Sequence, residues 1–473
     1  MPHFLVTAAH KSSGKTTISI GLSAALTARG QKVQTFKKGP DYIDPMWLGR
    51  AAGTACRNLD FYTQSNDEII ADYARAGRQA DATIVEGSKG LYDGMDPTGS
   101  DSTAALARLL GLPVILVIDT QGITRGVAPL ILGYQAFEPD IPVAGVILNK
   151  VASERHEGKL HAAVGHYTDV PVLGAVRRSK DLEIVERHIG LVPANEADDA
   201  DKQVARIAGH VADDVDLDLL ETVAGATPIS LARQVGDWAP AISTTGARVR
   251  IGVCRDAAFG FYYAADLEAL SEAGADLVPF DAIEDAHLPD VDGLFISGGF
   301  PETQMAALEA NGSMRADIKA AIEDGMPVYA ECGGLMYLAR QINWRGEVRE
   351  MVGALAADVV MTERPVGRGY VRLQETGLGP WPLQRDDDPT PEFPAHEFHY
   401  SRLENIDPAL AFAYDVRRGT GSDGAHDGLI YKNLLASYAH LRDVEGNRWT
   451  QRFVGFVRDC RDQNMAGLRS GKK

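Results

Sequence analysis

Short β-compatible runs alternate with helical stretches over roughly the first 220 residues, and this alternation limits the possible folds more than any other feature. The runs include HFLVTAA, ATIVEG and PVILVIDT, and turn or charged residues follow each of them. Strands that alternate with helices build βαβ units, so the pattern predicts a mostly parallel sheet covered by helices. Ligands of such sheets bind at the carboxyl ends of the strands, where we expect the functional residues.

A second series of the same kind begins at ARVRIGVCRD and continues through GLFISGG, PVYAECGG and LLASYAHL. The 473 residues of the chain also exceed what a single hydrophobic core usually fills. Between the two series, ATPISLARQVGDWAPAISTTG carries Pro, Ser, Thr and Gly with little periodicity, as a linker does. We therefore predict two α/β domains, at residues 1–225 and 248–473, joined by a linker at 226–247.

Composition and charge narrow the classes of function. A formal net charge of −18 argues against generic binding to nucleic acid or to anionic membranes. No apolar run reaches transmembrane length, and MPHFLVTAAHKSSGK lacks the basic start and long apolar core of a signal peptide. The cysteines are scattered without the spacing of metal ligands or of a disulfide framework. We expect a cytoplasmic protein with no nucleic-acid or membrane partner.

The segment AAHKSSGKTT lies between the first predicted strand and the helical stretch ISIGLSAAL. It fits the phosphate-loop pattern, with Ala9 in place of the leading glycine. Backbone N–H groups of such a loop wrap phosphates, Lys15 supplies positive charge, and the Thr16 hydroxyl can ligate Mg²⁺. We predict a nucleotide site, in which Asn149 after VILN reads the adenine edge. The predicted loop contacts are Lys11, Ser13, Gly14, Lys15, Thr16 and Thr17.

Acidic residues follow several predicted strands on the side of the phosphate loop. FKKGPDYIDP contains Asp41 and Asp44, IVEGSKGLYDG contains Glu86 and Asp93, and Asp119 follows VILVI. Carboxylates at this edge can ligate Mg²⁺ or meet a substrate. Each one alone has an alternative role as a cap or turn residue. Their accumulation at one edge favours a catalytic site.

The stretch YAECGGLMYL places Cys332 between the strand-like PVYA and the helical spacing of LMYLARQI, residues 335–342. This pattern predicts a strand, a sharp turn and a helix. A thiol above a helix N-terminus meets partial positive charge, which lowers its pKa, and backbone N–H groups there can receive an oxyanion. The alternative is a buried cysteine that acts as a small hydrophobe.

Two further segments supply what a thiolate nucleophile needs, namely a base and N–H donors. SYAHLR places His440 after another predicted strand, and FISGGFPE places Gly299 at the end of a strand. Together with Cys332 they form the layout of a class I glutamine amidotransferase, with Gly299 and Gly333 as the predicted oxyanion donors. Cys332 is then the nucleophile that attacks the glutamine amide, and His440 moves its proton.

The acid that orients the histidine is not apparent. Many triad amidotransferases carry a glutamate two places after the histidine, but Arg442 stands there in this chain. Glu331 and Glu397 are candidates for that role, and a Cys-His dyad is the alternative. The stretch EFHYS also contains His399, which lies near the substrate or packs in the core.

In their order along the chain, these motifs resemble the cobyrinic acid a,c-diamide synthase family over nearly the whole length. The shared motifs are SSGKTT, FKKGPDYIDP, NLD, VEG with GLYDG, ERHIGLVP, RDAAFGFYY, SGGFPE, YAECGGLMYL and HEFHYS. Such enzymes resemble dethiobiotin synthetase in the first domain and carry a triad-type amidotransferase domain second. The resemblance implies activation of acetate side chains on a cyclic tetrapyrrole with ATP and Mg²⁺, ammonia from glutamine, and a homodimer.

The resemblance also implies roles for the acidic residues. Lys15 and Thr16 would hold the triphosphate and Mg²⁺, with Asp41 and Glu86 beside the metal. The residues implied at the substrate are Tyr42, which would line the macrocycle pocket, and Asp44 and Asp93, which would lie near the carboxylate. An acyl phosphate is the expected intermediate, because a free carboxylate is a poor acceptor for ammonia.

The chain departs from the family pattern at Lys11, at Ser88-Lys89, after NLD and at Arg442. These differences keep sirohaem and nickel-sirohydrochlorin open as substrates beside cobyrinic acid. Lys11 resembles the signature lysine of deviant Walker ATPases, so a partitioning ATPase with a degenerate second domain is an alternative of another class; a solvated loop lysine is the simpler interpretation. A dethiobiotin-type ligase that uses no ammonia, and an amide synthase for a linear acid, are the remaining alternatives.

Overall fold

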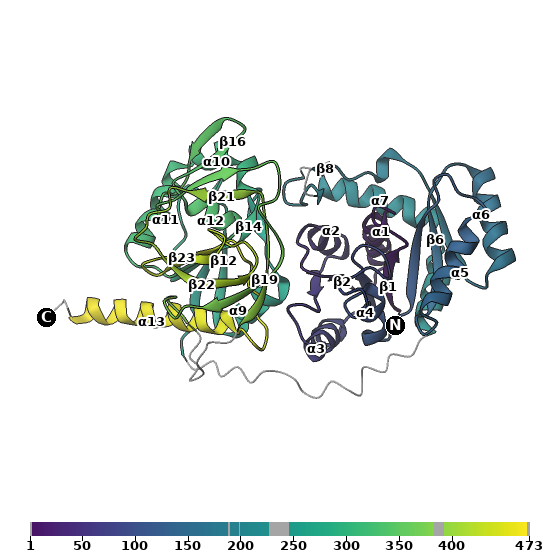
Figure 1. Cartoon of the computed structure of the whole chain (residues 1–473), viewed down its shortest axis with the longest axis horizontal. Helices are drawn as coiled ribbons and strands as arrows, with labels where there is room; N and C mark the ends of the chain where they lie inside the picture. The colour runs from purple at the N-terminus through teal and green to yellow at the C-terminus, as the bar shows by residue number, and fades with distance from the viewer. Residues whose placement is uncertain (1, 188–189, 198, 227–245, 383–391, 471–473) are drawn as a thin grey trace. The chain divides into compact units, whose positions relative to one another are not determined.

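The computed structural model describes residues 2–187, 190–197, 199–226, 246–382 and 392–470. The chain forms two compact units, Met1–Trp238 and Ala239–Lys473, each of which is an α/β structure (Figure 1). The predicted linker falls largely on residues 227–245, which lie outside the described residues, so its boundaries stay a prediction.

The first unit is built on a seven-stranded sheet in the order β3-β2-β4-β1-β5-β6-β7. All neighbouring strands are parallel, which confirms the predicted sheet. The strands are β1 His3–Ala8, β2 Val33–Lys38, β3 Arg57–Leu59, β4 Ala82–Glu86, β5 Val114–Asp119, β6 Val143–Val151 and β7 Val172–Arg177, with a short β8 Glu186–Arg187 and β9 Gly190–Leu191 pair. The helices are α1 Lys15–Ala28, α2 Ile43–Ala52, α3 Asn66–Gly77, α4 Thr103–Leu110, α5 Val127–Phe137, α6 Glu154–Tyr167, α7 Ala200–Asp214 and α8 Leu217–Gly225.

Helices cover both faces of this sheet, so its central strands are apolar at successive positions. Phe4 and Val6 of β1 pack in one core with α1, α2 and α7. Leu5, between them, points to the opposite face and packs with α3 and α4. Figure 1 shows α7 next to α1. The sheet thus presents the carboxyl ends of β1, β2 and β4 at one edge, where the phosphate loop and the acidic residues begin.

The second unit contains a nine-stranded sheet in the order β12-β10-β13-β15-β24-β23-β22-β19-β20. Its first five strands pair in parallel and the remaining pairs are antiparallel. The sheet strands are β10 Val249–Cys254, β12 Ala275–Phe280, β13 Gly293–Ile296, β15 Val328–Glu331, β19 Gly367–Glu375, β20 Phe393–His399, β22 Ala411–Arg418, β23 His426–Tyr431 and β24 Leu434–Ser437. The smaller sheets contain β11 Phe259–Phe261 and β14 Gly298–Gly299, and β16 Gln341–Trp344, β17 Glu347–Glu350, β18 Asp358–Met361 and β21 Ser401–Glu404. The helices are α9 Ala264–Glu272, α10 Met305–Ala310, α11 Gly312–Glu323, α12 Gly333–Leu338 and α13 Trp449–Ser470.

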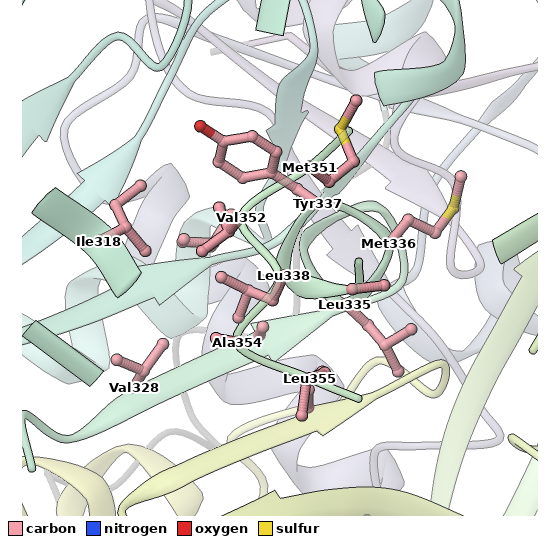
Figure 2. Packing of buried hydrophobic residues seen from close by; sticks show 14 of the residues in the cluster. Ile318, Val328, Leu335, Met336, Tyr337, Leu338, Met351, Val352, Ala354 and Leu355 are labelled. Atoms are coloured by element: carbon pink, nitrogen blue, oxygen red, sulfur yellow. The ribbon is translucent and has the colours of Figure 1, made fainter. Parts of the chain in front are cut away.

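The helix after Cys332 is shorter than the apolar spacing predicts. Helix α12 ends at Leu338. Residues 341 and 342, which the prediction placed in the same helix, begin β16, which pairs with β17 and β18. Every residue of α12 is buried. Figure 2 shows its side chains packed against Ile318, Val328 and the segment 351–355. The pairing of β16 therefore overrides the helical spacing, and the buried α12 fixes the turn that carries the cysteine.

Among the described helices, none has the length and apolar character needed to cross a membrane. All four cysteines are free thiols: Cys56, Cys254, Cys332 and Cys460.

Candidate active sites

The phosphate loop joins β1 to α1, and Gly14 is the residue that closes it. Gly14 has φ 87°, a left-handed conformation that favours glycine. A Cβ on Gly14 would also lie 2.2 Å from Nδ2 of Asn149, so no side chain fits. The Asn149 amide donates to the carbonyl of Ser13 at 2.8 Å and is nearly buried. Asn149 therefore supports the loop from the end of β6, and its predicted contact with adenine stays a prediction.

A second contact holds the outer part of the loop. Lys150 donates to the carbonyl of Ser12 at 2.9 Å and forms an ion pair of 2.7 Å with Asp119. Asp119 is thus tied to Lys150, the residue after Asn149, and supports the loop. Lys11 lies exposed on the loop and Thr17 lies half-buried in the first turn of α1. The predicted contacts of Lys11 and Thr17 with phosphate stay predictions.

The side chains at the inner end of the loop meet a buried lysine that sequence reasoning missed. Nζ of Lys37, at the end of β2, contacts Oε1 of Glu86 at 2.9 Å and also contacts Asp44. The same Glu86 oxygen accepts the Thr16 hydroxyl at 2.7 Å and lies 3.5 Å from Nζ of Lys15. Glu86 is fully buried and Lys37 is 2% exposed. Two ammonium groups and a hydroxyl thus converge on one carboxylate beside the phosphate loop.

The charges of this cluster control its protonation. Burial alone would lower the pKa of Lys37, but the charges of Asp44 and Glu86 raise it well above its ordinary value. Burial would raise the pKa of Asp44, but Lys37, with Lys15, brings it below its ordinary value. Burial, followed by the charge of Asp44, raises the pKa of Asp41 to about 6. Lys37 is therefore a fixed cation, and Asp41 accepts a proton more readily than Asp44 does.

The residues present fit a bound Mg²⁺. Oε2 of Glu86 is buried and has no hydrogen-bond partner in the described structure, so this oxygen is available to a cation. Mg²⁺ needs only one or two carboxylates together with phosphate oxygens and water. Among the described residues, no three or more His, Cys, Asp or Glu side chains form a ready-made cation cage. Glu86 and the Thr16 hydroxyl are the best-placed ligands, with Asp44 next to them.

The segment that carries Asp41 is held in place from β3. Oδ1 of Asp41 accepts the N–H groups of Ile43 at 2.9 Å and of Asp44 at 3.1 Å, which begins α2. The amide of Asn58 donates to the carbonyls of Gly39 and Asp41 at 2.8 and 2.7 Å. Asp41 thus serves as a turn residue at the start of α2 while its Oδ2 lies 3.8 Å from Nζ of Lys37. Its predicted place beside the metal stays a prediction.

The predicted substrate residues lie around the same edge. Tyr42 is half-buried at the start of α2. Asp93 is exposed in the loop after β4, where its carboxylate accepts the N–H of Gly90 at 2.9 Å. That loop is joined to the first strand, because the N–H of Leu91 donates to the carbonyl of Ala8 at 3.0 Å. Asp93 therefore lies exposed in a loop that is bonded to the end of β1, and the predicted roles of Tyr42 and Asp93 at the substrate stay predictions.

Lys37 gives the first testable consequence. Replacing Lys37 by methionine leaves buried carboxylates without their cation, a change that typically costs about 3–5 kcal/mol. We expect ATP-dependent product formation to fall by at least about 100-fold and the melting temperature to drop. Exposed Lys32 provides the matched control, since Lys32→Met should leave both unchanged. Equal activities for the two variants would contradict this role of Lys37.

Cys332 lies at a strained turn between β15 and α12. Its backbone has φ 47° and ψ −102°, an unusual conformation for a residue with a side chain. Strain of this kind collects at functional sites, as at the nucleophile of a strand–turn–helix elbow. The N–H of Cys332 donates to the carbonyl of Ser437 at 2.7 Å, which ties the turn to the end of the neighbouring strand β24. The predicted strand, turn and helix are all present.

The thiol pKa differs from the prediction. Burial, and then the charge of Glu302, raise the pKa of Cys332 above its ordinary value, although the N–H of Gly333 acts in the opposite direction. The six residues of α12 and the N–H of Gly333 therefore do not outweigh the loss of water around the sulfur. In the resting site the thiol keeps its proton, so a base must remove it during the reaction.

Glycines bring the predicted oxyanion donors together. A Cβ on Gly333 would lie 2.9 Å from the backbone nitrogen of Gly299, so these two residues are adjacent. A Cβ on Gly299 would lie 1.9 Å from the carbonyl oxygen of Ala258, and one on Gly334 would lie 2.0 Å from that of Ile296. Only glycine fits at either position. The two predicted donors, Gly299 and Gly333, thus lie next to each other beside the nucleophile.

The tight fit at Gly334 gives a second testable consequence. Gly334→Ala places a methyl group against a backbone carbonyl, and overpacking of this kind typically costs about 1–3 kcal/mol. We expect a lower melting temperature and reduced glutamine hydrolysis. Gly455→Ala is the control, because Gly455 lies within α13 with open space around it and alanine favours helices. A melting temperature equal to that of the unsubstituted chain would contradict the close packing at Gly334.

His440 follows β24 and reaches the same edge. A Cβ on Gly298 would lie 2.8 Å from Cε1 and 3.3 Å from Nε2 of the imidazole, so one side of the ring faces the Gly298–Gly299 strand. Nδ1 lies 3.1 Å from Oε2 of Glu331. The backbone pairs with that of His396 through hydrogen bonds of 2.7 and 3.3 Å. The nucleophile, the base and the glycine turn therefore converge at the carboxyl ends of neighbouring strands.

Glu397, the other candidate for the orienting acid, belongs to a different network. Its two carboxylate oxygens accept the N–H groups of Thr420 and Gly421, each at 2.8 Å. It lies 3.8 Å from His399, whose ring stacks on Tyr438 with centroids 3.8 Å apart. Glu331, and not Glu397, is the carboxylate that contacts His440.

The fold and the two sites define a class of protein: a phosphate-loop nucleotide-binding unit and a glutamine amidotransferase unit in one chain. Family models agree, since residues 5–192 match a CobQ/CobB/MinD/ParA nucleotide binding domain and residues 250–446 match a CobB/CobQ-like glutamine amidotransferase domain. The chain is 44% identical to a cobyrinate a,c-diamide synthase of Magnetococcus marinus over 97% of its own length and 98% of the relative. It is 41% identical to that of Methanosarcina acetivorans, over 94% and 93% of the two chains. The chain belongs to the cobyrinate a,c-diamide synthase family.

Proposed function

We propose that this chain catalyses the ATP- and glutamine-dependent amidation of the a and c acetate carboxylates of a cyclic tetrapyrrole of the cobyrinate type. The observation that carries this proposal is the presence of two separately built sites, one for phosphoryl transfer and one for glutamine hydrolysis. Curated relatives named cobyrinate a,c-diamide synthase match over nearly the full length of both chains and support the corrinoid substrate. A partitioning ATPase would have no use for a Cys-His site with oxyanion donors.

The first unit turns a carboxylate into an acyl phosphate. A carboxylate oxygen of the macrocycle attacks the γ-phosphorus of ATP, and ADP leaves. The phosphate loop and Lys15 hold the triphosphate, and Lys37 offsets the negative charge that gathers when substrate, nucleotide and Glu86 meet. Glu86 and the Thr16 hydroxyl would hold Mg²⁺, which would supply further charge neutralisation. Ammonia then attacks the acyl carbon, phosphate leaves, and the amide results.

The second unit supplies the ammonia. His440 removes the thiol proton as the sulfur of Cys332 attacks the amide carbon of glutamine, and the oxyanion forms beside the N–H groups of Gly299 and Gly333. His440 then gives the proton to the departing nitrogen, the C–N bond breaks, and ammonia leaves a glutamyl thioester. Water hydrolyses the thioester to glutamate and restores the thiol.

The substrate test uses three macrocycles in parallel. The chain is incubated with ATP, Mg²⁺ and glutamine together with cobyrinic acid, sirohaem or nickel-sirohydrochlorin, and products are weighed by mass spectrometry. We expect two amides on cobyrinic acid and none on the other two. Amidation of sirohaem or nickel-sirohydrochlorin alone would overturn the corrinoid substrate while leaving the reaction type intact. Product formation without glutamine or ammonia would overturn the reaction type itself.

Two finer parts of the proposal have their own tests. We propose Mg²⁺ as the metal, supported by the free oxygen of Glu86 beside Thr16, and expect EDTA to abolish ATP use and Mg²⁺ to restore it.

We propose a homodimer, supported by the resemblance of the sequence to this family. One chain has a mass of 50.9 kDa, and sedimentation velocity should give twice that mass.

A further inference from the structure

The position where many triad amidotransferases carry the orienting carboxylate holds a cation in this chain. Arg442 is 2% exposed, and its guanidinium lies 4.2 Å above the ring of Tyr263. Its Nε lies 3.7 Å from Oδ1 of Asp266, in α9. Arg442 is therefore directed toward α9, and a guanidinium offers no acceptor for an imidazole N–H.

A carboxylate reaches His440 from another strand instead. Oε2 of Glu331 lies 3.1 Å from Nδ1 of His440 and accepts the hydroxyl of Ser297 at 2.9 Å. Oε1 accepts the hydroxyl of Tyr329 at 2.7 Å and the N–H of Leu441 at 2.9 Å. All of these groups are buried. Partners on both oxygens fix the plane of the carboxylate, and one of them anchors the backbone next to His440.

The pairing of β15 with β24 explains how Glu331, the residue before the nucleophile, reaches His440. Residues 331 and 437 pair across the parallel strands β15 and β24. Both strands end there, so the chain turns at Cys332 on one strand and runs on to His440 from the other. The Glu331 side chain lies in the interior, where it meets the imidazole, while Cys332 follows at the strained turn.

We propose that Glu331 is the positioning residue of the glutamine site and takes the place of the missing triad carboxylate. As an acceptor beside Nδ1, it keeps the proton of the neutral imidazole on Nδ1, so that Nε2 is the nitrogen that removes the proton of Cys332. Its position beside Nδ1 stabilises the imidazolium that forms. The proton that leaves the sulfur passes through Nε2 of His440 to the departing nitrogen of glutamine. This inference rests on the proposed glutamine hydrolysis.

The test variant is Glu331→Gln, which keeps the shape and removes the charge. An amide that donates to Nδ1 would put the imidazole proton on Nε2, the wrong nitrogen for a base. We expect kcat for glutamine hydrolysis to fall by at least about 100-fold, with KM for glutamine within about twofold. Glu331→Asp keeps the charge and should restore part of kcat. Amidation supported by ammonium chloride, which uses only the first site, reports on folded protein.

The matched control is Tyr329→Phe, which removes one hydrogen bond to the same carboxylate and leaves its charge in place. We expect a lower melting temperature, with kcat reduced less than about tenfold. A normal kcat in Glu331→Gln, with a melting temperature lowered as in Tyr329→Phe, would show a structural role and overturn the inference alone. If Glu331→Gln does not fold, Glu331→Ala takes its place, and an unchanged kcat in that variant overturns the inference equally. An unsubstituted chain that does not hydrolyse glutamine would overturn both the inference and the proposed function.

Discussion

Replacing Cys332 by alanine is expected to abolish amidation with glutamine and to leave amidation with ammonium chloride intact. Alanine has no group that can form the thioester, so no ammonia is released from glutamine. Loss of a catalytic nucleophile commonly lowers kcat by about 10⁴-fold or more. Glutamate release, followed with and without a macrocycle, measures the first effect, and amide formation at high ammonium concentration measures the second.

The control for this substitution is Cys460→Ala, because Cys460 lies half-buried in α13 of the same unit, outside the site. That variant should hydrolyse glutamine at the rate of the unsubstituted chain. Continued glutamate release by Cys332→Ala would contradict its role as nucleophile. Loss of the ammonium-supported reaction as well would mean that the substitution damages the whole chain and not one site.

Glu86→Gln should give the opposite pattern, with no amidation from either nitrogen source and normal glutamine hydrolysis. Glu86 is fully buried and one of its oxygens contacts both Thr16 and Lys37. An uncharged amide leaves Lys37 with less compensation and deprives a bound Mg²⁺ of a ligand. Removal of one member of a buried ion pair typically costs about 3–5 kcal/mol, which corresponds to at least about 100-fold in rate if it acts at the transition state.

The experiment measures ADP and amide formation beside glutamate release. Glu138→Gln is the control, since Glu138 pairs with Arg108 at the surface, where one ion pair contributes little. We expect that variant to behave like the unsubstituted chain. Amide formation by Glu86→Gln at the normal rate would remove Glu86 from the proposed mechanism, and a parallel loss of glutamine hydrolysis would indicate unfolding.

Local patterns in the sequence predict the two architectures and both loops correctly. The phosphate loop follows from a short motif between a strand and a helix, and the turn at Cys332 follows from a strand-like run beside two glycines. The role of Lys37, which the sequence does not predict, and the choice between Glu331 and Glu397, which it leaves open, depend on contacts between distant residues. Lys37 and Glu86 are 49 positions apart, and Glu331 and His440 are 109 apart. The signal that could have identified Lys37 was the presence of a lysine in a strand predicted to be buried.

Two errors have specific physical causes. The predicted helix through Ile342 ends at Leu338, because residues 341–344 gain hydrogen bonds with β17 and β18 that local spacing does not reveal. The thiol pKa of Cys332 is raised and not lowered, because burial of the sulfur outweighs the field of the short α12. Both depend on tertiary structure, which neither residue periodicity nor a motif records.

The strand end that carries Cys332 and the strand end that carries His440 are bonded to each other through Cys332 and Ser437 and through Glu331 and Leu441. The thiol of Cys332 and the imidazole of His440 are therefore held in a fixed relative position, because separating them would break both hydrogen bonds. A glutamine site that is assembled in advance can hydrolyse glutamine even when no tetrapyrrole is being amidated. We therefore expect glutamine binding to be the controlled step, and slow glutamate release without ATP is the measurement that checks this.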